Sequence, residues 1–309
     1  MAATAVATPR HQRRLERRKR TLLPFEQAPD HYRDNPHIRH WYRPPANFRK
    51  SLASLFRLHN ETGNVWTHLI GFLIFLFLTA ATAAIHQALA SVLEVKGPVS
   101  RWPIYVFTAG AMVCLLTSAT CHLFGCCAAH ITAVMWRFDY AGIAVLIVAS
   151  FFPPVYYGFL CAPWVRLFYL VTTSLLGLST LGVTLGPAFQ RAEWQAYRAA
   201  LFVGLGLWGI IPMLHGLAAN AGEAAMVQAM SLDVLMGAIY IAGAVMYATQ
   251  FPECLKPGAF DVAFHSHQLF HVAVVVAACI HYKAVRILLA WRDASGGCLP
   301  PMPAAPPLA

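Results

Sequence analysis

Long apolar stretches alternate with short polar segments along most of this chain. Seven stretches are each about long enough to cross a bilayer, which takes about 20 helical residues. They cover residues 66–85, 102–124, 137–159, 167–185, 199–219, 229–249 and 267–290. The pattern therefore predicts an all-α membrane protein, a bundle of seven transmembrane helices.

A shorter pattern precedes the first span. Within residues 48–59, the side chains of Phe48, Leu52, Leu55 and Phe56 would share one side of a helix. This spacing predicts a short amphipathic helix lying along the membrane surface. The polar residues that follow, 59–68, predict a turn, with Trp66 at the membrane interface.

The two ends of the chain differ from the apolar centre. Residues 1–35 are basic and are predicted to form a disordered cytoplasmic tail. Residues 292–309 are rich in Pro and Ala and are predicted to form a disordered C-terminal tail. The part between them, residues 36–291, is then a single seven-helix membrane domain, because no other segment is large enough to fold separately.

Composition agrees with this picture and excludes a soluble domain. The chain has 309 residues, of which 58% are hydrophobic and 12% charged, with a mean hydropathy of +0.53. Soluble domains carry roughly 25% charged residues. The eight cysteines show no zinc-finger spacing and several lie inside apolar spans, so we expect no disulfide framework.

The net charge of +10 is concentrated before the first span. Residues 1–50 hold twelve Lys and Arg against four acidic residues, an excess of +8. Such a basic segment beside a membrane is typical of the cytoplasmic side; nucleic-acid binding is a weaker alternative, and we predict no nucleic-acid partner. Since seven is odd, the C-terminus is expected outside. The chain is thus predicted to be a multi-pass protein of the plasma membrane or an endomembrane, with a cytoplasmic N-terminus.

Two histidines at the start of the seventh span suggest a metal site. His267 and His271 are four residues apart, so on a helix they share one face. Two imidazoles at this spacing can reach one metal ion. The alternative is a pair of helix-end histidines that bond to water and backbone.

The order of the spans brings other polar residues to the same membrane depth. His122 ends the second span and Asp139 begins the third, so both are expected beside the His267 pair. Ser118 lies one turn before His122, on the same helix face. Three histidines from two helices with an open fourth position are typical of catalytic zinc. His281 lies 14 residues beyond His267, about 21 Å along a helix, and is too far for the same ion.

Several roles remain open for the other polar residues at this depth. Asp139 is a candidate fourth ligand, an anchor for a ligand, or a base acting on zinc-bound water. Ser118 is a candidate partner of a ligand or a water, and the alternative is a hydrogen bond to its own helix. His68 and His265 are spare candidates for metal binding at a similar depth.

Taken together, these stretches resemble the progestin and adipoQ receptor (PAQR) family, an adiponectin-receptor-like branch of the haemolysin-III-related proteins. The resemblance rests on residues 59–68 (HNETGNVWTH), the S-x-x-x-H motif of 118–122, the FDYAGI run of 138–143, PGAFD at 257–261 and HSHQLFH at 265–271. It covers nearly the whole chain. The short Arg-rich N-terminal tail departs from the animal receptors, so we predict no particular hormone ligand, and any extracellular ligand is unknown.

The resemblance implies seven helices with a cytoplasmic N-terminus and Zn²⁺ held by His122, His267 and His271. Asp139 would bind it directly or through water. It also implies receptor function and a link to ceramide hydrolysis, with a membrane lipid as substrate or ligand. Three functions stay open: a ceramidase-like zinc amide hydrolase, a signalling receptor whose zinc is structural, and a haemolysin-III-like pore or transporter.

Overall fold

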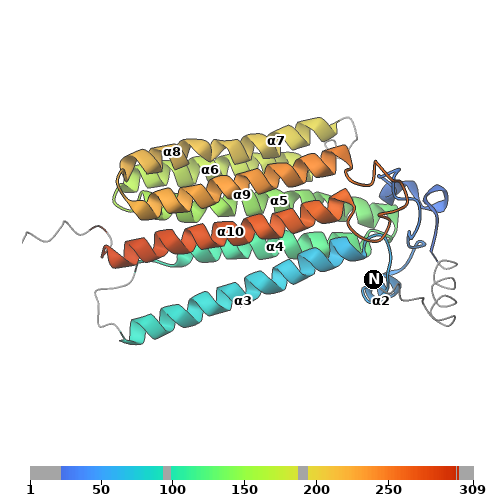
Figure 1. Cartoon of the computed structure of the whole chain (residues 1–309), viewed down its shortest axis with the longest axis horizontal. Helices are drawn as coiled ribbons and strands as arrows, with labels where there is room; N and C mark the ends of the chain where they lie inside the picture. Colours follow the sequence, from blue (N-terminus) through green and yellow to red (C-terminus); the bar gives the residue numbers. More distant parts are fainter. Residues whose placement is uncertain (1–21, 93–98, 187–193, 297, 299–309) are drawn as a thin grey trace, which may run out of the picture. The chain divides into compact units, whose positions relative to one another are not determined.

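The computed structural model describes residues 22–92, 99–186, 194–296 and 298, and nearly all of them are helical (Figure 1). Two 3₁₀ turns, η1 (Phe25–Gln27) and η2 (Asp30–Tyr32), come first. The α-helices are α2 (Phe48–Ser54), α3 (Thr62–Val92), α4 (Trp102–Phe124), α5 (Ala129–Gly158), α6 (Pro163–Leu185), α7 (Gln195–Trp208), α8 (Ile210–Ala219), α9 (Ala224–Thr249) and α10 (Ser266–Ala294). The described residues contain no strand beyond an isolated bridge between Leu23 and Tyr42.

Seven segments are long and apolar enough to cross a membrane, which confirms the predicted count. The first begins at Thr62, so most of the predicted polar turn at 59–68 is already helical. The third begins at Ala129, eight residues before the predicted start. The fifth consists of two helices, α7 and α8, that meet at Gly209, where an added Cβ would lie 2.0 Å from the Phe151 ring.

The chain divides into two compact units that both draw on several helices. The first unit takes in Met1–Leu73, Cys114–Gly142 and Gly237–Ala277, and the second takes in Ile74–Val113, Ile143–Met236 and Ala278–Ala309. Helices α3, α4, α5, α9 and α10 contribute residues to both units. All the residues predicted for the metal site belong to the first unit.

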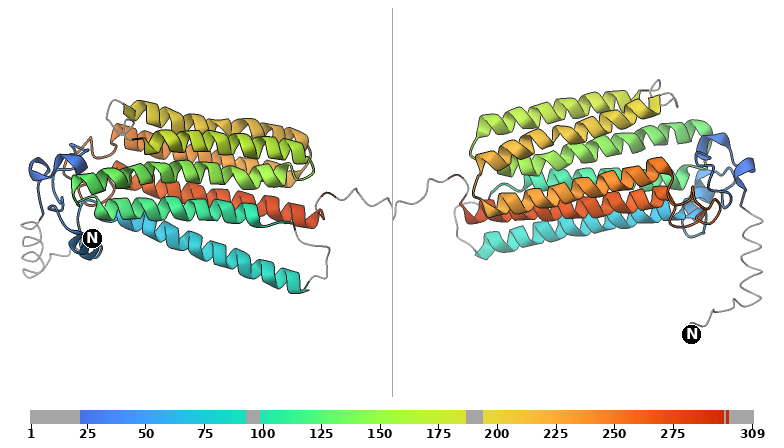
Figure 2. Two further views of the ribbon diagram at one scale, coloured as in Figure 1. Left: turned by 180° about the vertical axis from the view of Figure 1, so that it is seen from behind. Right: turned by 45° about the horizontal axis from the view of Figure 1, so that its top comes forward.

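In the first unit, the segment before α2 is packed rather than extended. Residues 1–35 were expected to be disordered, and 1–21 lie outside the described residues. Residues 22–35 hold η1 and η2, and Ala28 in this segment forms a buried cluster with Ile38 and Tyr42. This segment lies beside the loop that precedes α10 (Figure 2). The Gly258 N–H donates to the His37 carbonyl at 2.9 Å, and the Arg39 N–H donates to Asp261 at 2.8 Å.

The predicted amphipathic helix corresponds to α2 and is shorter than expected. The Asn47 side chain caps it by accepting from the Lys50 N–H at 3.0 Å. Phe48 stacks on Phe124 with ring centroids 4.3 Å apart, yet it stays 62% exposed, and Leu52 is 49% exposed. These exposed apolar side chains suit a helix on the membrane surface, and that location stays a prediction.

In the second unit, one pairing differs from the sequence expectation. Cys161 and Cys298 form a disulfide, although we expected no disulfide framework. Cys161 follows α5 and Cys298 follows α10. The ends of these two helices are also joined by Arg292 of α10, which donates to the carbonyls of Tyr157 and Gly158 in α5 at 2.6 and 3.1 Å. No short spacing signals this pairing, because the two cysteines are 137 residues apart.

Candidate metal centre

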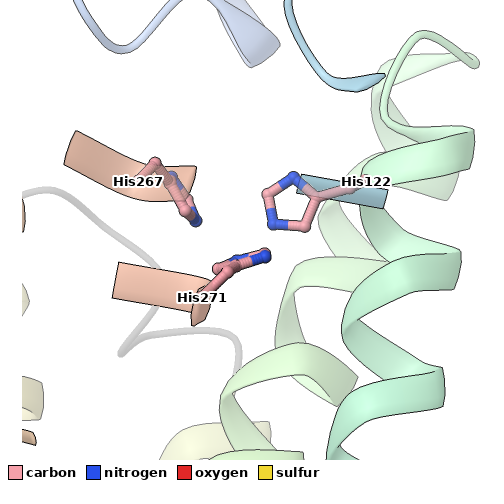
Figure 3. Close-up of side chains that lie close together, drawn as sticks. All are labelled: His122, His267 and His271. Carbon is pink, nitrogen blue, oxygen red and sulfur yellow. The ribbon is translucent and has the colours of Figure 1, made fainter. Parts of the chain in front are cut away.

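Three histidines converge in the first unit (Figure 3). His122 comes from the last turn of α4, and His267 and His271 come from the first two turns of α10. One ring nitrogen of each lies within 4.8 Å of the others. His122 and His271 are 2% exposed, and His267 is half-buried. The group can therefore hold a metal ion that is largely shielded from solvent.

The spacing and the free atoms fit such an ion. Nitrogens bound to a tetrahedral zinc at 2.0–2.1 Å lie roughly 3.3 Å apart, so small side-chain rotations would close the group. His122 Nε2 is buried and has no hydrogen-bond partner among the described residues. A buried nitrogen without a partner is costly unless something binds it, and an unprotonated imidazole nitrogen binds a metal.

Glu61 orients His122. The His122 Nδ1–H donates to Glu61 Oε2 at 2.7 Å, which leaves the lone pair of Nε2 to face the other histidines. The Asn64 amide donates to the same oxygen at 2.7 Å. A carboxylate behind a metal-binding histidine fixes its tautomer and raises its basicity. The sequence pattern did not predict this role of Glu61, because residues 59–68 were expected to form a polar turn.

Electrostatics keep Glu61 charged. Burial alone would raise the pKa of this carboxyl, but the hydrogen bonds from His122 and from the Asn64 amide outweigh burial and hold the pKa well below its usual range. An ionised carboxylate accepts hydrogen bonds and donates none. Glu61 therefore serves as a fixed acceptor for the His122 Nδ1–H.

The helix α3 orients His271 in a similar way. His271 Nδ1 donates to the Asn64 carbonyl at 3.1 Å, and the Thr67 hydroxyl lies 3.4 Å from the same nitrogen. The His271 ring also stacks on His68, with centroids 3.6 Å apart. His68 thus packs against the site from one side, and it is not among the three converging residues.

Two buried charged side chains hold the helix ends that carry these histidines. The guanidinium of Arg43 donates to the carbonyls of His122 and Leu123, both at 2.7 Å, which lack helical partners at the end of α4. Glu253, fully buried, accepts from the Ser266 N–H at 2.7 Å at the start of α10. The segment before α2 and the loop before α10 therefore fix both sides of the site.

Asp139 and Ser118 also lie at this site. The Ser118 side chain forms a hydrogen bond with Asp139, and the Asp139 carboxylate lies near enough to His122 for an electrostatic interaction. Ser118 is 3% exposed and Asp139 is half-buried. The structure thus brings the three predicted histidines together and pairs Ser118 with Asp139, and the roles predicted for these residues stay predictions.

The other candidate histidines have different surroundings. His265 Nε2 lies 3.3 Å from the Asn60 carbonyl, and His265 is not one of the three converging histidines. His281 belongs to the second unit, where it bonds to Asp233 and to the Ser150 carbonyl. Asn60, a formal glycosylation acceptor, is 5% exposed and donates to Glu61 at 3.3 Å, so its side chain is covered by protein.

Comparison with known proteins is consistent with this geometry. Residues 56–282 match the haemolysin-III-related family. The chain belongs to that family. The match includes all three converging histidines, Asp139 and Ser118.

Similar proteins come from plants and from a nematode. Heptahelical transmembrane protein 1 of Arabidopsis thaliana is 40% identical over 90% of this chain and 84% of its own length. Heptahelical transmembrane protein ADIPOR3 of Oryza sativa is 35% identical over 91% of this chain and 94% of its own length. Progestin and adipoQ receptor-like protein 1 of Caenorhabditis elegans is 36% identical over 85% of this chain and 60% of its own length. The chain is therefore a PAQR-type seven-helix membrane protein.

Proposed function

We propose that this protein is a PAQR membrane protein that hydrolyses a lipid amide, most simply a ceramide, at a zinc site near the cytoplasmic face. The observation that carries the proposal is the convergence of three imidazoles, one with a free buried nitrogen, beside the Asp139 carboxylate. Three neutral nitrogen ligands leave a fourth position for water or substrate, as in catalytic zinc sites.

Zinc suits this set of donors. Imidazole is a preferred ligand for zinc, which accepts four-coordinate geometry and has no redox chemistry. When bound, zinc would supply Lewis acidity that polarises an amide carbonyl and lowers the pKa of a bound water toward about 7.

The protein's own residues would manage the proton. Asp139 would accept a proton from the attacking water as the water oxygen bonds to the amide carbon. It would then donate this proton to the amide nitrogen when the C–N bond breaks. The products are a fatty acid and an amine. Ser118, through its contact with the Asp139 side chain, would hold that carboxylate in position.

The position of the site along the helices favours a lipid. His122 lies in the last turn of α4 and His267 in the first turn of α10, so the site is near one end of two membrane-spanning segments. An amide just beneath the lipid headgroups would meet it there, with acyl chains among the helices. A peptide or sugar has no comparable route to this depth.

A second function is a signalling receptor whose zinc joins α4 to α10 without catalysis. The nematode relative is named as a receptor-like protein, which supports this function. The substitution Asp139→Asn separates the two. A hydrolase should keep its metal and lose about 10²–10⁴-fold of its turnover, measured as fatty-acid release from ceramides by the purified, zinc-loaded protein. A structural site should leave both metal and signalling intact, and absence of release by the wild-type protein would exclude hydrolysis.

For the orientation, we propose a cytoplasmic N-terminus. The excess of +8 before the first span supports it. The Cys161–Cys298 disulfide supports it independently, because disulfides persist in oxidising compartments and this one would then lie outside. Epitope tags at each end, probed in intact and permeabilised cells, test the orientation. An N-terminal tag reached without permeabilisation would overturn it.

A further inference from the structure

A polar cavity lies in the second unit, among the end of α3, the start of α4 and the end of α10. Its volume is about 110 Å³, and its lining includes His86, Arg101, Arg286, Asp293, Ile85 and Leu289. This volume holds several water-sized groups. By the order of the helices, the cavity lies on the same side of the membrane as the Cys161–Cys298 disulfide.

The charges around the cavity do not balance. Arg101 and Asp293 form a two-pronged pair, with Arg101 nitrogens donating to the two carboxylate oxygens at 2.7 and 2.6 Å. Val99 N–H donates to the same carboxylate at 3.3 Å. Both carboxylate oxygens of Asp293 therefore accept hydrogen bonds from Arg101. Arg286 forms no ion pair with any described residue. The two guanidinium groups and the one carboxylate of the lining give it a net charge of +1.

Several hydrogen-bonding groups of Arg286 and His86 at the cavity have no partner among the described residues. Arg286 has five N–H groups, and across the described residues it makes one long hydrogen bond, to the Tyr282 hydroxyl at 3.4 Å. His86 Nδ1 is buried and has no partner within the described ranges. A cation and a buried ring nitrogen that face one small space suit an anion with several acceptor oxygens.

The surroundings of the cavity suit an acyl chain. Ile85 lines it and is 44% exposed, and Ala290 on its rim is also exposed. Figure 1 shows the end of α3 diverging from α10 at this level.

We propose that this cavity binds the singly charged oxyanion, a phosphodiester or a carboxylate, of a membrane amphiphile whose tail lies along α3 and α10. The +1 charge of the lining matches one negative charge. Arg286 is the main contact, His86 offers a further hydrogen bond, and the Arg101–Asp293 pair shapes the wall. This inference does not depend on the proposed hydrolysis.

Lipid retention by the purified full chain tests the proposal. The protein is exchanged into lipid-free detergent and offered dioleoyl phosphatidylglycerol, oleate or neutral diolein, and bound lipid is counted by native mass spectrometry. We expect retention of one of the two anions at least ~10-fold above diolein, and a similar loss in Arg286→Gln, since hydrogen bonds to charged groups contribute about 1.5–3 kcal/mol. Preference for phosphatidylglycerol identifies a phosphodiester, and preference for oleate a carboxylate.

Matched variants make the result specific. Lys283→Gln removes an exposed charge from the same helix outside the cavity and should change nothing. His86→Phe keeps a ring in place but removes the ring nitrogens, and it should weaken lipid retention. Arg286→Lys keeps the charge and should preserve most of the retention. These two variants test the proposal even if Arg286→Gln fails to fold. His267→Ala should not alter oleate retention at this cavity. Equal retention of all three lipids, or equal retention by wild type, Arg286→Gln and His86→Phe, overturns the proposal.

Discussion

Helix α10 contributes buried histidines to both units, and their ring nitrogens are used in opposite ways. In the first unit, His267 and His271 face His122, whose buried Nε2 has no partner in the described part of the chain. In the second unit, both nitrogens of His281 face acceptors: Nδ1 lies 2.8 Å from the Asp233 carboxylate and Nε2 lies 2.9 Å from the Ser150 carbonyl.

This difference separates a binding site from a structural contact. A carbonyl only accepts, so His281 Nε2 donates to Ser150, while Nδ1 is hydrogen-bonded to the Asp233 carboxylate. Nothing is left on that ring to bind a cation. In the first unit, one ring nitrogen of each of the three histidines instead lies within 4.8 Å of the others, so the group can hold a cation. Burial of a histidine in a membrane is thus not enough to mark a metal site.

The largest expected effect is the loss of metal from the first unit. His267→Ala removes one of three ligands. Because losing a partner behind a ligand already costs about 10–100-fold in metal affinity, the loss here should exceed ~100-fold. Zinc content of the purified protein, measured by elemental analysis, checks it, with His281→Phe as the matched control on the same helix. Full zinc in His267→Ala, or its loss in His281→Phe, would reverse the comparison.

The second unit should show the opposite pattern, a large loss of stability with metal retained. His281→Phe leaves the buried Asp233 carboxylate without its partner, and breaking a buried pair in this way costs about 3–5 kcal/mol. Thermal unfolding in detergent measures it. Adding Asp233→Leu removes the stranded charge and should recover most of the loss. If the double variant is no more stable than His281→Phe, the pair is not what stabilises this region.

The sequence predicted the seven helices and the residues of the site for a simple reason. Apolar length shows where a chain crosses a membrane, and helix order alone brings His122, Asp139 and His267 to one depth. It did not predict Glu61, Arg43 or Glu253. Their roles depend on contacts such as that between Arg43 and the His122 carbonyl, 79 residues apart. A helical reading of residues 61–68 would have put Glu61, Asn64 and His68 on one face.

A smaller effect tests how the site is oriented. In Glu61→Gln the side chain still fills its place but loses its charge, so the His122 Nδ1–H has a weaker acceptor and the ring is less basic. Metal affinity should fall by about 10–100-fold, measured by competition with a chelator of known affinity. Glu26→Gln, at an exposed position in η1, is the control. Unchanged affinity in Glu61→Gln would show that Arg43 and the packing alone orient His122.

The smallest expected effect concerns a third kind of histidine, one whose ring nitrogen accepts a hydrogen bond. His59, 1% exposed, accepts from the Glu61 backbone N–H through Nδ1 at 3.1 Å, so it is neutral. Burial, reinforced by the charge of Arg43, lowers the pKa of His59 to about 3, against roughly 6.5 in an unfolded chain. Because the unfolded chain binds the proton more readily, the stability that His59 contributes is fully present above about pH 6.5. It is lost as the pH falls toward 3.

At pH 5.5, one unit below the unfolded value, this loss is about 1.4 kcal/mol. His59→Asn places an oxygen where Nδ1 accepts, and it cannot be protonated. In chelator, so that metal loss does not contribute, the wild-type protein should lose more stability between pH 7 and pH 5.5 than this variant does. His130→Asn, at an exposed position in the first turn of α5, replaces an imidazole that lacks this contact and should behave like wild type. Parallel pH profiles for the wild-type and His59→Asn proteins would mean that His59 takes up its proton without opening the turn that precedes Glu61.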